Sequence, residues 1–409
     1  MAGSYFVPGR IEVLGKHTDY AGGRSLLAAV NRGFVIGSVP RDDDVVRVID
    51  STRRQQVEYD SNAAVRGEAP AWAAYPLAVL RRCERNFPHA RGGADIAFAS
   101  DLPQAAGLSS SSALVVATFL ALDAVRQMSR SAEYLDAITG QEDLAGYLGA
   151  VENGMSFRTL EGHAGVGTMG GSEDHTAILC ARPGRLVQYR YAPVRFEGEV
   201  LLPAGWTFAI ASSGVRAEKA GGAMTRYNEL SAATRRLVQL WQAAGAGGED
   251  TLGGIVTQHP DASLQMREIV RRDAPAEAEM LLTRLAQFVA ESEDIVPGAS
   301  AALGRGDIRG FGEFVRRSQH CAVQALRNQI PETMHLVETA LTSGAAAASA
   351  FGAGFGGSVW ALVREEGARD VLSTWRAAYV SRFPQWNDSS EFFISTAAAP
   401  AARLTPEAT

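Results

Sequence analysis

The alternation of apolar and polar positions predicts a chain that mixes strands and helices. Short alternating runs bounded by glycine, proline or aspartate are typical of strands. Strands are expected at residues 5–14, 33–39, 45–49, 56–59, 93–99, 206–212, 358–363 and 391–395. Aspartate-rich segments at 42–44 and 60–62 predict hairpin turns.

Apolar residues spaced three or four positions apart predict the helices. They are expected at residues 72–85, 110–127, 135–152, 227–244, 276–292, 308–330 and 368–383, the sixth with a break near Arg317. The two kinds of element do not alternate strictly as βαβ units, so we expect an α+β fold rather than a doubly wound sheet. A boundary between two halves is expected near residues 198–205.

The composition is that of a globular protein and excludes several classes. Hydrophobic residues make up 46% and charged residues 21% of the 409 positions, which argues against a disordered chain. The net charge of −6 offers no basic field for a nucleic-acid backbone. The three cysteines are odd in number and far apart, which excludes a disulfide framework or a CxxC site and favours a reducing cytosol.

Neither a signal peptide nor a membrane span is expected. The N-terminus has no basic segment followed by an apolar one. The uncharged run at 344–363 is rich in alanine, serine and glycine, so we interpret it as a helix end, a glycine loop and a strand. We therefore expect a cytoplasmic protein with no nucleic-acid or membrane partner.

The scarcity of lysine removes one class of nucleotide site. Of the 39 basic residues only Lys16 and Lys219 are lysines. A Walker A loop needs a lysine followed by serine or threonine, whereas histidine follows Lys16 and alanine follows Lys219. A P-loop is therefore excluded.

The first segment with chemical interest is PGRIEVLGKHTDYAGG, residues 8–23. It places Arg10, Lys16, His17 and Asp19 among glycines. Polar groups of both signs suit a small molecule rich in hydroxyl groups. An ordinary turn with surface charges gives the same pattern, and the segment alone does not decide between the two.

The second segment, residues 101–114, leads from a small-residue loop with four serines, Ser109–Ser112, directly into an apolar helix. The unpaired N–H groups and the dipole at a helix start attract anions, small residues let a phosphate approach, and serine hydroxyls can bind Mg²⁺. N-capping by one serine is the simpler explanation. Four serines exceed what a cap needs, which favours an anion site.

The third and fourth segments are rich in glycine. Residues 165–176 set Asp174 beside a glycine loop, where its carboxylate fits a base or metal ligand and equally fits a helix N-cap. Residues 351–359 match GxGxxG and the longer kinase pattern GxGxxGxV. A dinucleotide site needs a strand before the glycines and a helix after them, whereas we expect a helix before them and a strand after them. A protein kinase needs a lysine downstream of the glycines, and this sequence has none there. A glycine hairpin that brings backbone close to a ligand remains.

Taken in order, these segments resemble the GHMP family of small-molecule kinases and its galactokinase branch. Residues 9–20 are similar to the galactokinase signature, and residues 107–114 to the ATP motif of the family. Residues 171–174 resemble the loop of the catalytic aspartate, and residues 352–358 the third motif. The similarity extends from residue 8 to about residue 396.

The resemblance implies a two-lobed α+β fold with the active site in the cleft between the lobes. It implies a ribosomal-protein-S5-domain-2-like N-terminal half at residues 1–200 and a ferredoxin-like C-terminal half at 201–396, and we expect a frayed tail at 397–409. The implied activity is ATP- and Mg²⁺-dependent phosphorylation of the anomeric hydroxyl of galactose or a related sugar. We expect a monomer or weak homo-oligomer.

Site residues follow from the same resemblance. Asp174 would be the catalytic base, Arg10 would stabilise charge, and Ser110 would bind Mg²⁺ with Glu152, for which Glu161 is a rival. Sugar contacts are expected from Lys16, His17, Asp19, Gly171 and Tyr227. Nucleotide contacts are expected from Trp72, Gly107, Leu108, Ser109, Ser110, Ser111 and Ser112.

Departures from the family pattern leave the sugar open. Lys16 stands where galactokinases carry a glutamate that approaches the 6-hydroxyl of the sugar. A lysine there suits the C6 carboxylate of galacturonate, unless it turns to solvent or toward Glu12 or Glu173. Glu12 replaces the usual asparagine, and Ser172, Glu173 and His175 replace the usual neighbours of the aspartate.

A non-catalytic sensor of galactose and ATP with the same fold is the alternative from a different class. Such sensors typically lose part of the serine loop or the aspartate. Both Ser109–Ser112 and Asp174 are present here, and no DNA-binding arm is visible.

Overall fold

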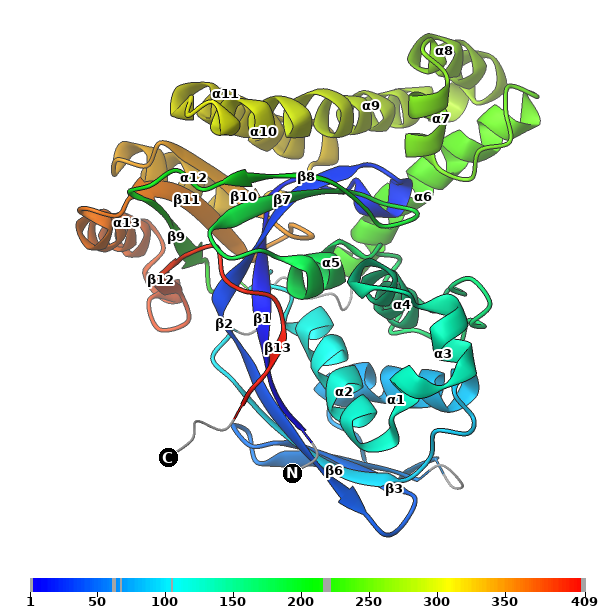
Figure 1. Ribbon diagram of the computed structural model, residues 1–409. Coiled ribbons are helices and arrows are strands. Elements are labelled where there is room, and N and C mark those ends of the chain that lie inside the picture. Colours follow the sequence, from blue (N-terminus) through cyan, green and yellow to red (C-terminus); the bar gives the residue numbers. More distant parts are fainter. Residues whose placement is uncertain (1–2, 61–63, 67, 104–105, 216–221, 406–409) are drawn as a thin grey trace.

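The computed structural model describes residues 3–60, 64–66, 68–103, 106–215 and 222–405. Within these residues, a large mixed sheet and a smaller antiparallel sheet form the framework (Figure 1). The large sheet has the order β13-β1-β2-β6-β3-β4-β5, with β7 paired to β2 and β8 to β7. Its strands are β1 (Gly3–Leu14), β2 (Arg24–Arg41), β3 (Val45–Asp50), β4 (Gln55–Asp60), β5 (Ala64–Arg66), β6 (Gly93–Ser100), β7 (Arg185–Arg190), β8 (Arg195–Leu201) and β13 (Ala402–Arg403).

Strand β2 is long enough to pair with two different strands along the same edge. Its start pairs with β7, and its second half, Phe34–Arg41, pairs with β6. Helix α2 (Ser110–Arg126) packs across β1 and β2. It is almost wholly apolar and buried because it lies between the sheet and further helices. These are η2 (Ala71–Ala73), α1 (Ala74–Asn86), η3 (Met128–Arg130), α3 (Ala132–Ala137), α4 (Gln141–Asn153) and α5 (Glu173–Cys180).

The second sheet has the order β10-β11-β9-β12 and draws its strands from three distant parts of the chain. They are β9 (Trp206–Ser212), β10 (Ala347–Phe351), β11 (Ser358–Arg364) and β12 (Glu391–Ser395). The helices of this half are α11 (Ile308–Cys321), the π-helical turn Ala322–Leu326, α12 (Pro331–Thr342), α13 (Ala368–Arg382) and the 3₁₀ turn Pro384–Trp386. Trp360 and Trp375 are fully buried here, as expected for core residues.

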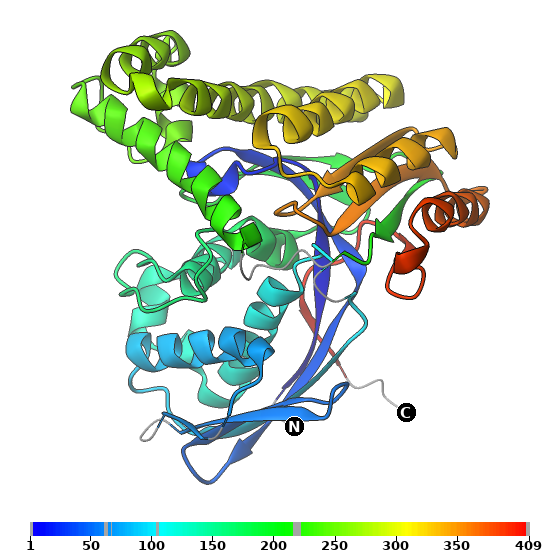
Figure 2. The same ribbon diagram turned by 180° about the vertical axis from the view of Figure 1, so that it is seen from behind.

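A helical arm projects beyond the two sheets, as Figure 2 shows from behind. It contains α6 (Gly222–Ala243), α7 (Leu252–Gln258), α8 (Ala262–Asp273), the 3₁₀ turn Pro275–Glu277 and α9 (Ala278–Val289). The arm has its own core around Trp241 and Phe288. Helix α9 continues through a π-helical turn, Ala290–Ile295, into α10 (Val296–Gly304), which packs against α11 and against β8 and β2 of the large sheet.

Several predicted elements differ from the structure. The helix expected at 135–152 is two helices, α3 and α4, separated around Gly140. The alanine-rich run before the fourth segment is strand β10, not a helix end, because it is buried on both faces and pairs with β11. The helix expected to reach residue 330 ends at Leu326, and its irregularity lies in the π turn rather than near Arg317. Strands β7 and β8 and helices α7, α8, α10 and α12 were not predicted.

The expected frayed tail is also wrong for the residues described. Ala402 and Arg403 pair with β1 as β13, and the Ala398 N–H donates to the Ala29 carbonyl. Residues 406–409 of that tail lie outside the described residues. The division at residues 200 and 201 stays a prediction; the chain changes sheet between Leu201 and Trp206. No helix of the described residues is long and apolar enough to cross a bilayer.

Candidate active site

The four glycine- and serine-rich segments meet around one cavity of about 710 Å³. Its walls come from β1, the turn after β1, the start of α2, the end of α4, the start of α5 and the glycine turn between β10 and β11. These elements lie far apart in sequence, so the fold itself assembles the site.

The serine loop forms the anion-binding part of the cavity wall. Gly107 and Ser109 adopt positive φ values of 76° and 58°, which turn the chain sharply into α2 at Ser110. Ser109 is the N-cap residue, yet its side chain makes no capping hydrogen bond within the described structure. Capping of α2 by the Ser109 side chain therefore does not explain the run of serines. The first N–H groups of any helix lack a partner within the helix, and this 17-residue helix begins where Ser109–Ser112 line the cavity.

The glycine turn between β10 and β11 packs against the start of the serine loop. The Ser358 hydroxyl donates to the Ala106 carbonyl over 2.5 Å. A Cβ on Gly352 would lie 3.1 Å from the Gly107 carbonyl oxygen, so the two backbones approach closely. The close contact that the glycines permit is thus with another loop, while Gly352 and Ala353 also line the cavity. A strand precedes and a strand follows this turn, which excludes the dinucleotide fingerprint.

Arg10, which is buried, forms an ion pair with the partly exposed Asp174 in the wall of the cavity. Arg10 Nε and Nη2 lie 2.7 and 2.6 Å from Asp174 Oδ1, and Arg10 Nη1 donates to the Gly107 carbonyl over 2.6 Å. Burial alone lowers the pKa of Arg10, but the carboxylates of Asp174, Glu173 and Glu12 outweigh it and raise that pKa overall. The guanidinium therefore stays charged, and it joins the aspartate to the serine loop.

Ser112, Glu152 and Asp174 bring hydroxyl and carboxylate oxygens together beside this pair. Ser112 Oγ lies 2.8 Å from Glu152 Oε2 and 3.2 Å from Asp174 Oδ2. Mg²⁺ prefers oxygen ligands and is usually held by one or two carboxylates plus phosphate. These donors fit such an ion.

The structure bears on two of the expected Mg²⁺ ligands. Ser110 lines the cavity, but Ser112 is the serine whose hydroxyl contacts Glu152. Glu161 is exposed and pairs with Arg85, away from the cavity. It is therefore no rival to Glu152.

The expected sugar contacts His17, Asp19, Gly171 and Tyr227 gather at the other end of the cavity. His17 Nδ1 lies 2.9 Å from the Tyr20 hydroxyl, and the His17 and Tyr227 rings are 5.1 Å apart. Burial and the nearby guanidinium of Arg284 lower the pKa of His17 to about 3, so this ring is neutral near pH 7.

Asp19 is locked against the loop that carries Gly171. The Asp19 carboxylate accepts a hydrogen bond from the Glu173 N–H over 3.3 Å. A Cβ on Gly171 would lie 2.5 Å from Asp19 Oδ2, so only glycine lets the two segments approach this closely. Burial, with Asp174 nearby, raises the pKa of Asp19.

Aromatic side chains form a further part of the cavity wall, which includes the expected nucleotide contact Trp72. The Trp72 ring meets Phe98 edge to face at 5.4 Å, and its Nε1 donates to Gln55 over 2.9 Å. Tyr75 and Phe98 line the same region. Leu108 does not line the cavity: its side chain is buried in the core, and its carbonyl accepts from the Arg10 N–H.

Lys16 is the sequence-predicted sugar contact that the structure places elsewhere. It is 2% exposed, and Nζ donates to Ser349 Oγ over 2.8 Å and to Ser318 Oγ over 3.1 Å. It is absent from the described cavity walls. The expectation that it contacts the sugar is not met, because the hydroxyl groups of Ser318 and Ser349 hold the ammonium group away from the cavity.

Three family models match the chain. The GHMP kinases N terminal domain matches residues 74–151, the GHMP kinases C terminal domain matches residues 299–381, and the galactokinase galactose-binding signature matches residues 2–37. The chain belongs to the GHMP kinase family. The resemblance inferred from the motifs is thereby confirmed.

Relatives named galactokinase extend over most of this GHMP kinase. The galactokinase of Chloroflexus aggregans is 29% identical over 381 residues, 92% of this chain and 87% of the relative. That of Streptomyces coelicolor is 28% identical over 386 residues, 93% of this chain and 89% of the relative. The enzyme class is that of a galactokinase-like phosphotransferase.

Solved structures confirm the two-lobed α+β fold of the kinase. A crystal structure of Lactococcus lactis galactokinase complexed with galactose has a TM-score of 0.79 at 20% identity, covering 98% of this chain and 95% of that chain. A mevalonate kinase from L. major in complex with R-mevalonate has a TM-score of 0.56 at 16% identity, covering 97% of both chains. At these identities the likeness shows the fold alone.

Two acidic residues of the kinase site were not predicted as functional. Glu12 and Glu173 line the cavity and are 3% and 5% exposed. Burial raises the pKa of both carboxyl groups. The charge of Glu12 raises the pKa of Glu173 further, whereas Lys16 and Arg10 oppose the rise at Glu12. Ser25 Oγ donates to Glu173 over 2.5 Å. The sequence did give one signal for a role of these two residues, since both replace residues that are usual in the family.

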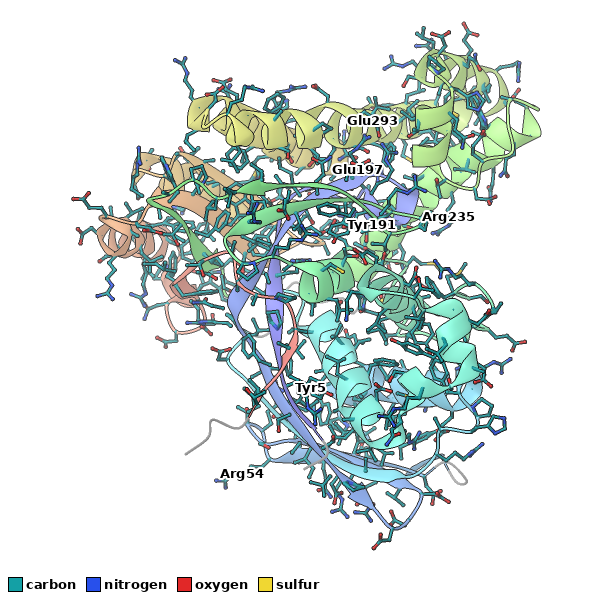
Figure 3. All side chains as sticks on the ribbon, viewed as in Figure 1. Tyr5, Arg54, Tyr191, Glu197, Arg235 and Glu293 are labelled. Atoms are coloured by element: carbon teal, nitrogen blue, oxygen red, sulfur yellow. The ribbon has the colours of Figure 1, made fainter. Side chains whose placement is uncertain are left out.

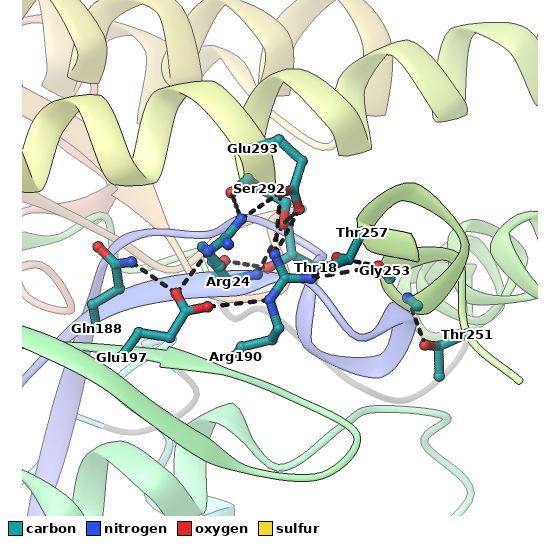
Figure 4. A network of polar contacts seen from close by, with 11 residues as sticks. Thr18, Arg24, Gln188, Arg190, Glu197, Thr251, Gly253, Thr257, Ser292 and Glu293 are labelled. Carbon is teal, nitrogen blue, oxygen red and sulfur yellow. Dashed lines mark hydrogen bonds and ion pairs between the residues drawn. The ribbon is translucent and has the colours of Figure 1, made fainter. Parts of the chain in front are cut away.

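A charged network joins the start of β2, next to the turn that carries His17, to the helical arm of the kinase. Figure 3 places Glu197 and Glu293 where the strands meet the helices, and Figure 4 shows the network that joins them. Arg24 contacts Glu197 at 2.6 Å and Glu293 at 2.5 Å, and Arg190 contacts the same two carboxylates. Because the Thr18 hydroxyl donates to the Arg24 carbonyl, this network also fixes the position of His17 and its neighbours.

Proposed function

We propose that this kinase transfers the γ-phosphoryl group of ATP to the anomeric C1 hydroxyl of galactose. The observation that carries the proposal is the Arg10–Asp174 pair, which lies between the serine loop and the cavity end lined by His17, Asp19 and Tyr227. Phosphoryl transfer depends mainly on positioning and on neutralising charge, and these groups supply both. The matches to galactokinases and to the galactose-binding signature support galactose as the sugar.

The nucleotide phosphates would bind at the start of α2. Backbone N–H groups and the hydroxyls of Ser110 and Ser111 face that position, while Trp72 offers an apolar wall for the base. Glu152 and Ser112 would hold Mg²⁺, which neutralises phosphate charge when bound.

Asp174 would accept the proton of the C1 hydroxyl while that oxygen bonds to the γ-phosphorus and ADP leaves. The carboxylate is partly exposed, at 22%, and lines the cavity. Arg10 fixes one of its oxygens and is close enough to the serine loop to offset the charge of the transferring group. General-base assistance of this kind contributes roughly 10²–10⁴-fold.

The sugar would be held by neutral and acidic groups. His17 is neutral, and Asp19, Glu12 and Glu173 add carboxyl groups to the same end. Such an environment favours a neutral sugar over a uronate, since Lys16, the cation that would have paired with a C6 carboxylate, does not line the cavity. The galacturonate alternative thus loses its supporting residue.

Sugar-dependent release of ADP from Mg-ATP tests the proposal. Galactose, galacturonate, N-acetylgalactosamine, glucose and arabinose would be compared at equal concentration. Galactose is expected to give the highest kcat/KM. Binding of galactose and ATP without ADP release would instead favour the sensor, and a clear preference for galacturonate would contradict the account of Lys16.

A further inference from the structure

His175, the residue after Asp174, has no role in the proposed reaction so far. It is 1% exposed and lies in α5 where this helix packs against α4. It also belongs to the wall of the cavity. In the described structure neither of its ring nitrogens has a hydrogen-bond partner. A buried imidazole without partners is unfavourable, so a ligand for it is expected.

The nearest polar atom indicates what that ligand is. His175 Nε2 lies 3.2 Å from Glu152 Oε2, close in distance but without the alignment of a hydrogen bond. Two ligands at about 2.1 Å from one ion and at right angles to each other lie about 3 Å apart. Ser112 Oγ is 2.8 Å from the same Glu152 oxygen. The two spacings suit donors that share one cation.

We propose that His175 Nε2 is a nitrogen ligand of the divalent cation held by Glu152 and Ser112. The inference rests on the proposed function, because that cation accompanies the nucleotide. Among the described residues no three His, Cys, Asp or Glu side chains form a complete metal site, so phosphate oxygens and water complete the coordination.

The chemical consequence is a changed metal preference. Imidazole nitrogen binds later transition ions better than Mg²⁺, and affinities at a mixed nitrogen and oxygen site rise from Mn²⁺ toward Cu²⁺. Oxygen-only sites suit Mg²⁺ and Mn²⁺ alike. The kinase site is therefore expected to prefer Mn²⁺ or Co²⁺ over Mg²⁺ more strongly than a site made of Glu152 and Ser112 alone.

Pulsed electron paramagnetic resonance of bound Mn²⁺ tests the ligand directly. The probes are Mn²⁺ alone and Mn²⁺ with the methylene analogue of ATP, which has no nitrogen between its phosphates. The wild-type protein is expected to show ¹⁴N coupling that changes to ¹⁵N coupling when histidine is ¹⁵N-labelled. His175→Gln is expected to lose this coupling and to raise the Kd for Mn²⁺ about tenfold or more, with a smaller change for Mg²⁺.

His259→Gln is the matched control, because His259 also contacts a glutamate, Glu249, at 2.8 Å, but in the helical arm. This variant is expected to keep the nitrogen coupling and the Mn²⁺ affinity. Absence of histidine coupling in the wild type, its persistence in folded His175→Gln, or a lack of Mn²⁺ binding overturns the proposal. Failure of the nucleotide analogue to bind, with nitrogen coupling retained for Mn²⁺ alone, contradicts the proposed kinase function and leaves the ligand assignment standing.

Discussion

Arg10 Nε donates to Asp174 Oδ1 over 2.7 Å, joining strand β1 to the first turn of α5 across 164 positions of the chain. The same guanidinium donates to the Gly107 carbonyl of the serine loop. One buried cation therefore sets the distance between the loop proposed to bind phosphate and the carboxylate proposed to accept a proton. The reaction geometry depends on this link.

Asp174→Asn is predicted to lower kcat by roughly 10²–10⁴-fold, because the amide cannot accept the proton of the sugar hydroxyl. The Kd for the nucleotide should change little, since the serine loop and aromatic wall are untouched. Steady-state kinetics and isothermal titration measure the two quantities. Asp143→Asn, which alters an ion pair with Arg158 away from the cavity, is the control and should keep wild-type turnover. Turnover close to wild type in Asp174→Asn would remove the aspartate from the mechanism.

Ser112→Ala and Ser110→Ala are predicted to differ. Ser112 Oγ contacts Glu152, so its loss should raise the Mg²⁺ concentration needed for half-maximal activity by about tenfold. Ser110 lines the cavity at the start of α2, where the phosphates are proposed to bind, so its loss should act mainly on the KM for ATP. Activity titrated with Mg²⁺ at saturating ATP separates the two. Equal Mg²⁺ dependence of the variants contradicts the assignment of Ser112.

Lys16→Met is predicted to destabilise the fold by about 1–3 kcal/mol without changing sugar choice. The substitution removes the donor to Ser318 and Ser349 and takes away one of the two cations near Glu12, the other being Arg10. Chemical denaturation measures the first effect. The ratio of kcat/KM for galactose to that for galacturonate measures the second and should stay within about twofold. A tenfold shift in the ratio would place the lysine at the sugar.

Lys16 also shows what the sequence alone does not determine. Its unusual charge within the signature was visible, and two directions for the side chain were open. The hydroxyls that decide the direction, on Ser318 and Ser349, lie 302 and 333 positions away, so local sequence contains no information about them. By contrast, the approach of Arg10 to Asp174 could be anticipated, because both belong to motifs whose order and spacing resemble a known family.

The fold was predictable where the hydrophobic period is strong and unpredictable where it is weak. The apolar helix after the serine loop and the strand at Glu391–Ser395 were expected from their patterns. The small residues of β10 have little propensity that separates a strand from a helix, and its pairing with β11 decides the outcome. Ser112, the serine whose hydroxyl contacts Glu152, was not singled out because four identical residues give no sequence basis for choosing among them.

Glu12→Gln is predicted to change how stability depends on pH. Burial raises the folded-state pKa of Glu12 from its ordinary value of 4.5 to about 7, and the charge of Glu291 adds to the rise. Lys16, Arg10 and a hydrogen bond with Glu173 oppose it. The native state thus holds the proton more tightly than the unfolded chain does. The stabilisation is full below about pH 4.5 and is lost as the pH rises toward the folded-state value, by at most about 1.4 kcal/mol per pH unit.

Because glutamine does not titrate, the stability of Glu12→Gln relative to wild type should improve as the pH rises from 5 to 8. Urea denaturation at each pH gives the difference. Glu58→Gln, at the partly exposed ion pair with Arg47, is the control and should show a flatter difference. A difference for Glu12→Gln that stays constant with pH would show that its carboxyl group titrates normally.

The central claim is that the Arg10–Asp174 site phosphorylates the anomeric hydroxyl of galactose, and the most direct measurement is the structure of the product. Galactose labelled with ¹³C at C1 would be incubated with Mg-ATP and the kinase, and the product examined by ³¹P and ¹³C nuclear magnetic resonance. The account predicts a phosphate coupled to C1, formed by the wild type and at a rate lower by at least 10²-fold by Asp174→Asn. Phosphate on another carbon, or undiminished product from Asp174→Asn, would contradict it.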